Sequence, residues 1–235
     1  MHSFVVDFAE IVFKVNCLYS ETKAFCKDYL SDSEFKYEVF ITKNDIERED
    51  ERTEIKCSNQ YLERLALQRK VSDLLINEKI LLFHSSVIEV NGEAYVFTAP
   101  SGTGKSTHTR LWREYLKKQD VHMVNDDKPF IRIGNEIVAY GTPWKGKEGI
   151  GENRKAKIKA ICFLSQGNTN EICMMEKKNI LPSLLGQTYL NSDRNKLVRT
   201  ICLLQKIADD IPICKMECNT SQEAAKLSFE YMARL

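Results

Sequence analysis

The sequence predicts a mixed α/β fold, and three observations lead to this prediction. Runs of β-type apolar residues alternate with stretches in which apolar residues recur every three or four positions. A glycine-rich loop at 99–106 directly follows one β-type run and directly precedes a helical stretch. The 235 residues, 43% of them hydrophobic and 29% charged, suffice to bury a core of ordinary size. We therefore expect one main domain with a small additional lobe.

The first part of the chain, residues 1–55, predicts a small α+β lobe. The alternating run at 4–15 indicates one or two strands, 21–30 indicates a short helix and 36–42 a further strand. The charge-rich segment 44–54 interrupts the hydrophobic pattern, and we interpret it as a solvated loop or connector. TKND at 42–45 is similar to the guanine-reading motif of GTPases, but it precedes the glycine-rich loop, so we interpret it as a turn.

Residues 56–235 predict the main domain. A stripe of leucines indicates a helix beginning at Ser58, and two β-type runs, 79–90 and 93–99, flank Asn91-Gly92, a strong hairpin signal. Residues 105–118 continue from the glycine-rich loop as a helix. The remaining expected elements are strands at 121–127, 130–134, 137–141, 156–166, 170–177 and 211–218, helices at 179–190 and 193–210, and a terminal helix capped by Ser221.

Composition argues against several classes of function. A net charge of +1 disfavours binding to nucleic acid or to an anionic membrane, and no apolar run approaches the ~18 residues of a spanning helix. The eight cysteines include no C-x-x-C pair and lie mostly in apolar contexts, so we interpret them as buried hydrophobic residues rather than zinc ligands. We expect a cytoplasmic protein that binds neither nucleic acid nor membranes; its oligomeric state stays open, a homo-oligomer included.

The glycine-rich loop APSGTGKS at 99–106 is the strongest functional signal. Backbone amides at the start of the following helix can surround an anion, and the helix dipole favours negative charge there. Gly102 and Gly104 permit the turn, Lys105 can reach β- and γ-phosphates, and the Ser106 hydroxyl can ligate Mg²⁺. We therefore expect ATP and Mg²⁺ as cofactors. The predicted nucleotide-binding residues are Ser101, Gly102, Thr103, Gly104, Lys105, Ser106 and Thr107.

Ala99 stands where the usual loop pattern has glycine. Alanine is tolerated there if φ is negative and is costly only if φ must be positive. Because Pro100 biases the preceding residue toward extended geometry, we expect Ala99 to occupy the end of a strand.

Two further segments carry candidate site residues. Asp126 and Asp127 end a strand after the loop helix, so one carboxylate can hold a metal while the other accepts a proton; the alternative is a polar turn. Within 141–155, rich in glycine and cations, Lys145, Lys147 and Arg154 can contact phosphate or substrate; the alternative is an exposed connector. Taken alone, His84 is a structural histidine, and His108 is solvent-facing or a cap with no assigned role.

In combination, four features resemble the HPr kinase/phosphorylase family, which is related to phosphoenolpyruvate carboxykinases. They are His84, APSGTGKST at 99–107, VNDD at 124–127 and GTPW-x-GK at 141–147. The resemblance covers about residues 80–166 and is greatest to the short HPr-kinase-like proteins, some of which are encoded beside peptide-maturation pathways and phosphorylate serine in a peptide. It implies a P-loop kinase core of the HPr kinase C-terminal-domain type.

The resemblance also implies residue roles. Asp126 would be the general base toward a serine hydroxyl, Asp127 would assist the metal with Ser106, and Lys105 would hold phosphate. His84 would lie near the catalytic aspartate and tune its pKa. One sequence does not fix which aspartate does which. Ala99 departs from the family pattern, and the protein-substrate signature of true HPr kinases is missing, which puts HPr as the substrate in doubt.

The expected function is an ATP- and Mg²⁺-dependent kinase that transfers the γ-phosphate to a hydroxyl, preferably serine, of a peptide, small protein or small metabolite. The alternative is a non-catalytic ATP-binding accessory protein of a peptide-maturation pathway. Carboxykinase-like chemistry on a small acid ranks last, because it would require further metal ligands and an acid-binding arginine.

Overall fold

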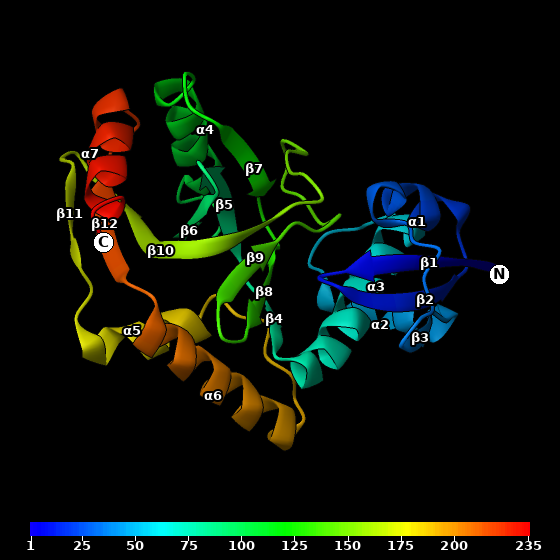
Figure 1. The fold of residues 1–235 in the computed structure, drawn as a ribbon. Coiled ribbons are helices and arrows are strands. Elements are labelled where there is room, and N and C mark those ends of the chain that lie inside the picture. Colours follow the sequence, from blue (N-terminus) through cyan, green and yellow to red (C-terminus); the bar gives the residue numbers. More distant parts are fainter. The chain divides into compact units, whose positions relative to one another are not determined.

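Two sheets organise this mixed α/β chain, one in each of two units, Met1–Asn77 and Glu78–Leu235 (Figure 1). The computed structural model describes residues 1–235. None of its helices combines the length and the apolar composition that a bilayer crossing requires.

The first unit has a three-stranded sheet in the order β1-β2-β3. β1 and β2 form an antiparallel hairpin, and β2 pairs in parallel with β3. The elements are β1 His2–Phe8, β2 Ile11–Cys17, α1 Ser20–Phe25, the 3₁₀ turn Lys27–Tyr29, β3 Tyr37–Phe40, α2 Lys43–Arg52 and α3 Asn59–Leu75, followed by the 3₁₀ turn Ile76–Glu78.

The charge-rich segment interpreted as a loop is helix α2, so that interpretation and the turn at 42–45 are both wrong. Thr42 and Asp45 form a capping box, in which the Asp45 amide donates to the Thr42 hydroxyl and the Thr42 amide donates to the Asp45 carboxylate. The helix buries Ile46 and the Glu49 carboxylate, which Arg69 of α3 binds at 2.6 Å. One apolar position and two acids paired with α3, Glu49 with Arg69 and Asp45 with Lys70, hold the helix. A search for an apolar stripe does not detect such a helix.

The division between the units lies at Asn77 and not at the expected boundary after residue 55, because α3 belongs to the first unit. The buried Glu63 carboxylate of α3 accepts hydrogen bonds from the backbone amides of Leu18 at 2.6 Å and Tyr19 at 3.3 Å, and from the Thr22 hydroxyl. Because Glu63 accepts these hydrogen bonds from the segment after β2, α3 is part of the same unit as the preceding strands.

The second unit has a nine-stranded mixed sheet, with the order β4-β8-β9-β10-β6-β5-β7 and with β12 and β11 added beside β10. The strands are β4 Ile80–Leu82, β5 Ser85–Val90, β6 Glu93–Thr98, β7 Val121–Asn125, β8 Phe130–Ile133, β9 Ile137–Tyr140, β10 Lys155–Gln166, β11 Glu171–Met174 and β12 Ile213–Cys218. The helices are α4 Lys105–Tyr115, α5 Lys177–Leu185, α6 Arg194–Asp210 and α7 Gln222–Met232.

Strand direction explains where the site forms. β5 is antiparallel both to β6, with Ser85 opposite Thr98, and to β7, with Val87 opposite Asn125. β6 and β7 therefore run in the same direction, and their carboxyl ends lie at the same edge of the sheet as the amino end of β5. The predicted hairpin between β5 and β6 is confirmed, since Asn91 and Gly92 have φ values of 53° and 87°.

The core beneath α4 fixes this helix on the sheet. Trp112 is fully buried among aromatic rings, with its centroid 5.0 Å from Phe97 and 5.3 Å from Phe229 of α7. α4 and α7 lie side by side (Figure 1). The Trp112 Nε1–H donates to the Ser228 hydroxyl of α7 at 2.8 Å, so the two helices share a buried polar contact as well.

Candidate functional site

The glycine-rich loop connects β6 to α4 as expected. Gly102 and Gly104 have φ values of 81° and 112°, which L-residues with side chains rarely adopt. A Cβ at either position would meet no atom within 4 Å, so backbone conformation and not space requires glycine. Ala99 directly follows β6, is not among the residues with positive φ and is buried in the core, so alanine is tolerated at this position.

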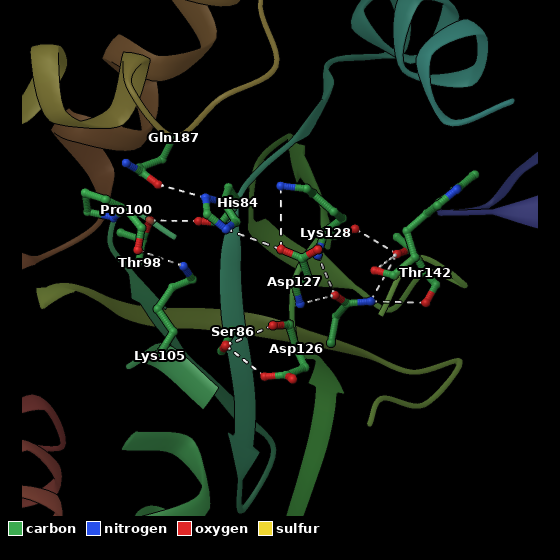
Figure 2. Close-up of polar contacts among 12 residues, drawn as sticks. His84, Ser86, Thr98, Pro100, Lys105, Asp126, Asp127, Lys128, Thr142 and Gln187 are labelled. Atoms are coloured by element: carbon green, nitrogen blue, oxygen red, sulfur yellow. Dashed lines mark hydrogen bonds and ion pairs between the residues drawn. The ribbon is translucent and has the colours of Figure 1, made fainter. Parts of the chain in front are cut away.

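Lys105 is the first residue of α4, and its side chain extends back along the glycine-rich loop. Its Nζ donates to the carbonyl oxygens of Ala99 at 2.9 Å and Pro100 at 3.4 Å (Figure 2). Burial lowers the pKa of Lys105, whereas the charges of Asp127 and Asp126 act in the opposite direction. The ammonium therefore lies within the field of both carboxylates.

Asp126 follows β7 and is buried. The Ser86 hydroxyl of β5 lies 3.0 Å from its Oδ1 and 3.1 Å from its main-chain oxygen (Figure 2), while Oδ2 is buried without a hydrogen-bond partner. Burial raises the pKa of Asp126, and the hydrogen bonds from Ser106 and Ser86 partly oppose that rise. A Cβ built on Gly146 would lie 2.8 Å from Oδ2, so only glycine lets the loop after β9 pass this close.

Asp127 has a different environment although it is adjacent in sequence. Its Oδ1 lies 3.3 Å from His84 Nε2 and 3.5 Å from Lys128 Nζ (Figure 2). The other ring nitrogen of His84, Nδ1, lies 3.2 Å from Gln187 Oε1. Burial alone would raise the pKa of Asp127, but the hydrogen bond from His84 and the charge of Lys128 together hold it below its usual value.

Asn125 supports the turn that carries Asp127. Its Oδ1 accepts from the backbone amides of Asp127 at 2.8 Å and Lys128 at 2.7 Å, which closes an Asx turn. Its Nδ2 donates to the Thr142 carbonyl at 3.1 Å and hydroxyl at 3.0 Å, and that hydroxyl donates to the Lys128 carbonyl at 2.7 Å. The loop that begins at Gly141 is thereby fastened to the turn that carries the aspartates.

A cavity of about 420 Å³ brings most of the predicted site residues together. Its walls are His84, Ser101, Gly102, Gly104, Lys105, Ser106, Thr107, Asp126, Asp127, Gly146, Lys147 and Glu148. Of the other candidates, Thr103 lines a neighbouring cavity, and Lys145 lines neither. Lys147 is therefore the cation that the loop after β9 brings to this cavity.

Arg154 lies outside the cavity that contains most of the predicted site residues, and its guanidinium is paired with acidic side chains. Its Nη1 donates to both carboxylate oxygens of buried Glu89, at 2.8 and 3.0 Å, and its Nε donates to Glu152 at 3.2 Å. The guanidinium compensates a buried charge on β5, and Arg154 is absent from the cavity walls. The partner lies 65 residues away in the chain, so sequence spacing gave no sign of it.

His108 is buried, so its interpretation as solvent-facing or as a cap is wrong. Its Nε2 lies 2.9 Å from the Ser228 hydroxyl, and burial lowers its pKa to about 4. His108 belongs to the polar contact between α4 and α7.

Sequence reasoning missed Ser86, Gln187 and Thr142. Ser86 and Gln187 contact Asp126 and His84 across 40 and 103 residues, so no local pattern identifies them. Asn125 gave a usable signal, because an asparagine two positions before Asp127 is a typical start of an Asx turn.

The residues at this cavity fit Mg²⁺, a cation that prefers oxygen ligands and keeps several waters. The buried Asp126 Oδ2 has no partner, and Ser106 lines the same cavity. No group of three or more His, Cys, Asp or Glu side chains could hold a metal without help. A metal here would need phosphate oxygens or water to complete its coordination.

Comparison with solved structures finds distant similarity. No protein-family model and no curated protein matches the chain. A solved structure of the HPr(Ser) kinase/phosphatase from Coxiella burnetii aligns with 53% of this chain and 93% of its own, at 10% identity and a TM-score of 0.28. At this score the match does not establish a shared fold or activity. The chain therefore has only a low structural similarity to HPr(Ser) kinase/phosphatase, over about half of its length.

Proposed function

We propose that the unit Glu78–Leu235 is an ATP- and Mg²⁺-dependent phosphotransferase that transfers the γ-phosphoryl group to a hydroxyl. One observation carries the proposal: a single cavity of about 420 Å³ holds the glycine-rich loop, Lys105 and two adjacent carboxylates in unlike environments. Phosphoryl transfer requires little beyond such positioning and charge stabilisation.

The loop and Lys105 bind the phosphates in this proposal. Amides at the start of α4 face the anion, and the Lys105 ammonium leaves the carbonyls of Ala99 and Pro100 to contact β- and γ-oxygens. Bound Mg²⁺ supplies neutralisation of the phosphate charge. Asp126 and Ser106 would hold the metal, because the Asp126 Oδ2 is the buried acceptor without a partner.

Asp127 is the better candidate for the general base. Its lowered pKa keeps it ionised at neutral pH, and His84 and Lys128 fix its carboxylate at the cavity wall. The acceptor oxygen attacks the γ-phosphorus, the bond to the ADP oxygen breaks, and the hydroxyl proton passes to Asp127. This reverses the assignment implied by the family resemblance, in which Asp126 was the base and Asp127 the metal ligand; the sequence itself left that choice open.

Lys147 would stabilise charge on the transferred group. It follows Gly146, whose missing side chain lets the loop approach Asp126, and Thr142 anchors the same loop to Asn125. A cation held beside the developing charge stabilises the transition state more than the ground state. The acceptor class, a serine of a peptide or small protein or a small metabolite, rests on the family resemblance of the motifs.

The test is a transfer assay with γ-labelled ATP, Mg²⁺ and a library of hydroxyl-bearing peptides and metabolites, read by mass spectrometry. We expect a phosphate ester on a hydroxyl, and Lys105→Ala should lower the rate by about 10²–10³-fold. The matched control is Lys117→Ala, an exposed lysine that lines neither cavity, which should leave the rate unchanged. Binding of ATP without transfer to any hydroxyl would favour the non-catalytic accessory protein.

A further inference from the structure

A second cavity, of about 640 Å³, shares Gly102, Gly104 and Thr107 with the first. The rest of its walls come from Thr103 of the glycine-rich loop, from α4, from the end of β10 with the loop that follows, and from the end of β12 with the loop before α7. A ligand with its phosphates at the glycine-rich loop can therefore extend into this second cavity.

The two cavities differ in charge. Lys105, Asp126 and Asp127 line the first, whereas no Asp, Glu, Lys or Arg lines the second. His108 in the second wall is neutral at physiological pH, because burial lowers its pKa to about 4. The second cavity consequently suits an uncharged part of a ligand whose charged part occupies the first.

The walls of the second cavity combine apolar surfaces with amides. Leu111 of α4 and Leu164 of β10 are buried residues of the core that reach the cavity. Asn219 is fixed, since its Nδ2 donates to the Asn168 carbonyl at 3.3 Å and its Oδ1 accepts from the Ser221 amide at 3.0 Å. The Asn168 side-chain amide lies in an exposed loop and makes no hydrogen bond, so it can pair with a ligand.

A contact already joins this cavity to the phosphate loop. Gln166, the last residue of β10, lines the second cavity, and its Nε2 donates to the Thr103 carbonyl at 3.2 Å. The wall of the uncharged cavity is therefore hydrogen-bonded to the loop that would hold the phosphates.

We propose that the second cavity binds the adenine base of the donor nucleotide, with the Asn168 amide paired to the edge of the base; this rests on the proposed function. An amide offers one acceptor and one donor, which match the adenine N6 amino group and the ring nitrogen beside it. Guanine also presents an acceptor beside a donor, O6 and N1–H, but its N2 amino group is a further donor that a carboxylate would pair, and no carboxylate lines this cavity.

Titration calorimetry with ATP, GTP and inorganic tripolyphosphate, each with Mg²⁺, tests the proposal. The wild-type protein should bind ATP at least tenfold more tightly than GTP or tripolyphosphate. Asn168→Ala should weaken ATP binding about tenfold, as expected for the loss of two hydrogen bonds, and leave tripolyphosphate binding within about twofold. Asn168→Asp should shift the preference toward GTP, because a carboxylate can accept from both guanine donors.

The matched control is Asn179→Ala on the exposed surface of α5, which lines neither cavity and should change none of the three affinities. Equal binding of ATP, GTP and tripolyphosphate would overturn the adenine site and leave phosphate binding at the loop intact, as would an Asn168→Ala variant with unchanged ATP affinity. Tighter binding of GTP than of ATP by the wild type would overturn the choice of base. Binding of none of the three ligands would overturn the proposed function itself, and the adenine site with it.

Discussion

Asp126 and Asp127 show how adjacent carboxylates acquire different properties from strand pairing. Asp126 turns toward Ser86 on the neighbouring strand and is buried, whereas Asp127 turns toward His84 and Lys128 at the cavity wall. Burial raises the pKa of the first. For the second, burial also acts upward, but the hydrogen bond from His84 and the charges of Lys128, His84 and Lys105 together lower the pKa. Unlike environments of this kind separate the roles of paired acids.

The raised pKa of Asp126 predicts a cost to stability in the absence of Mg²⁺. The folded state favours the protonated Asp126 carboxyl, and this preference adds to the free energy of unfolding. The contribution is fully present below the ordinary carboxyl pKa and is lost as the pH rises through the raised pKa. At neutral pH Asp126→Asn should therefore raise the free energy of unfolding by roughly 1 kcal/mol, or about 2–4 °C in melting temperature.

Thermal melts of the two proteins across the acidic to neutral range measure this effect. The difference should shrink as the pH falls and Asp126 takes up a proton. Asp120→Asn, at an exposed carboxylate, is the control and should change the free energy of unfolding by less than about 0.5 kcal/mol. A less stable Asp126→Asn variant at neutral pH would show that the buried charge is compensated by groups in the fold.

Residues at the site were predictable where the chemistry is contiguous in the chain. The glycine-rich loop and the aspartate pair each lie within a few positions, so their spacing carried the prediction. Ser86 and Gln187 were not predictable, because β5 and the segment after α5 bring them from elsewhere in the chain. Arg154 was predicted to contact phosphate because its sequence context, a cation in a glycine-rich segment, is the same for a ligand-binding arginine and for one that pairs with a buried acid. In the structure its partner is the buried Glu89.

At the scale of elements, the loop after β9 is the part of the site most sensitive to a small change. Its Gly146 lies so close to Asp126 that a Cβ would stand 2.8 Å from Oδ2, which forces either the loop or the carboxylate to move. Gly146→Ala should lower the transfer rate at least tenfold, since displacements of about 1 Å at a catalytic group can cost 10²-fold. Rates and melting temperatures measured together separate this effect from unfolding.

The control for this change is Gly134→Ala in the turn between β8 and β9. A Cβ at Gly134 would meet its nearest atom at 3.6 Å, an ordinary contact, so the variant should keep both its rate and its melting temperature. If Gly146→Ala transferred phosphate as fast as the Gly134→Ala variant, the close approach of the loop to Asp126 would have no catalytic role.

Elements were predicted well where their stabilisation is visible in a periodic pattern. The hairpin of β5 and β6, the helix after the loop and the helix α6 follow from apolar periodicity and turn residues. Helix α2 was missed because it depends on a Thr42 capping box and on the Glu49–Arg69 ion pair, neither of which alters hydrophobic periodicity. A charged segment that follows a helix-capping residue should therefore be considered as a helix before it is predicted to be a solvated loop.

At the scale of the whole molecule, all of the candidate site residues lie in Glu78–Leu235. One sheet topology explains their convergence, because β5 runs opposite to both β6 and β7 and so sets His84 and Ser86 beside the ends of the other two strands. The domain boundary was not predictable from the charge-rich segment, since the contacts of Glu63 attach α3 to the first unit.

The most direct test of the central claim is the rate of γ-phosphoryl transfer by Asp127→Asn at saturating ATP and Mg²⁺. Nucleotide affinity is measured on the same protein, so that loss of binding is distinguished from loss of chemistry. If Asp127 is the general base, transfer should fall by about 10²–10⁴-fold while the affinity for ATP with Mg²⁺ stays within about threefold. Transfer at the wild-type rate by Asp127→Asn would contradict the account.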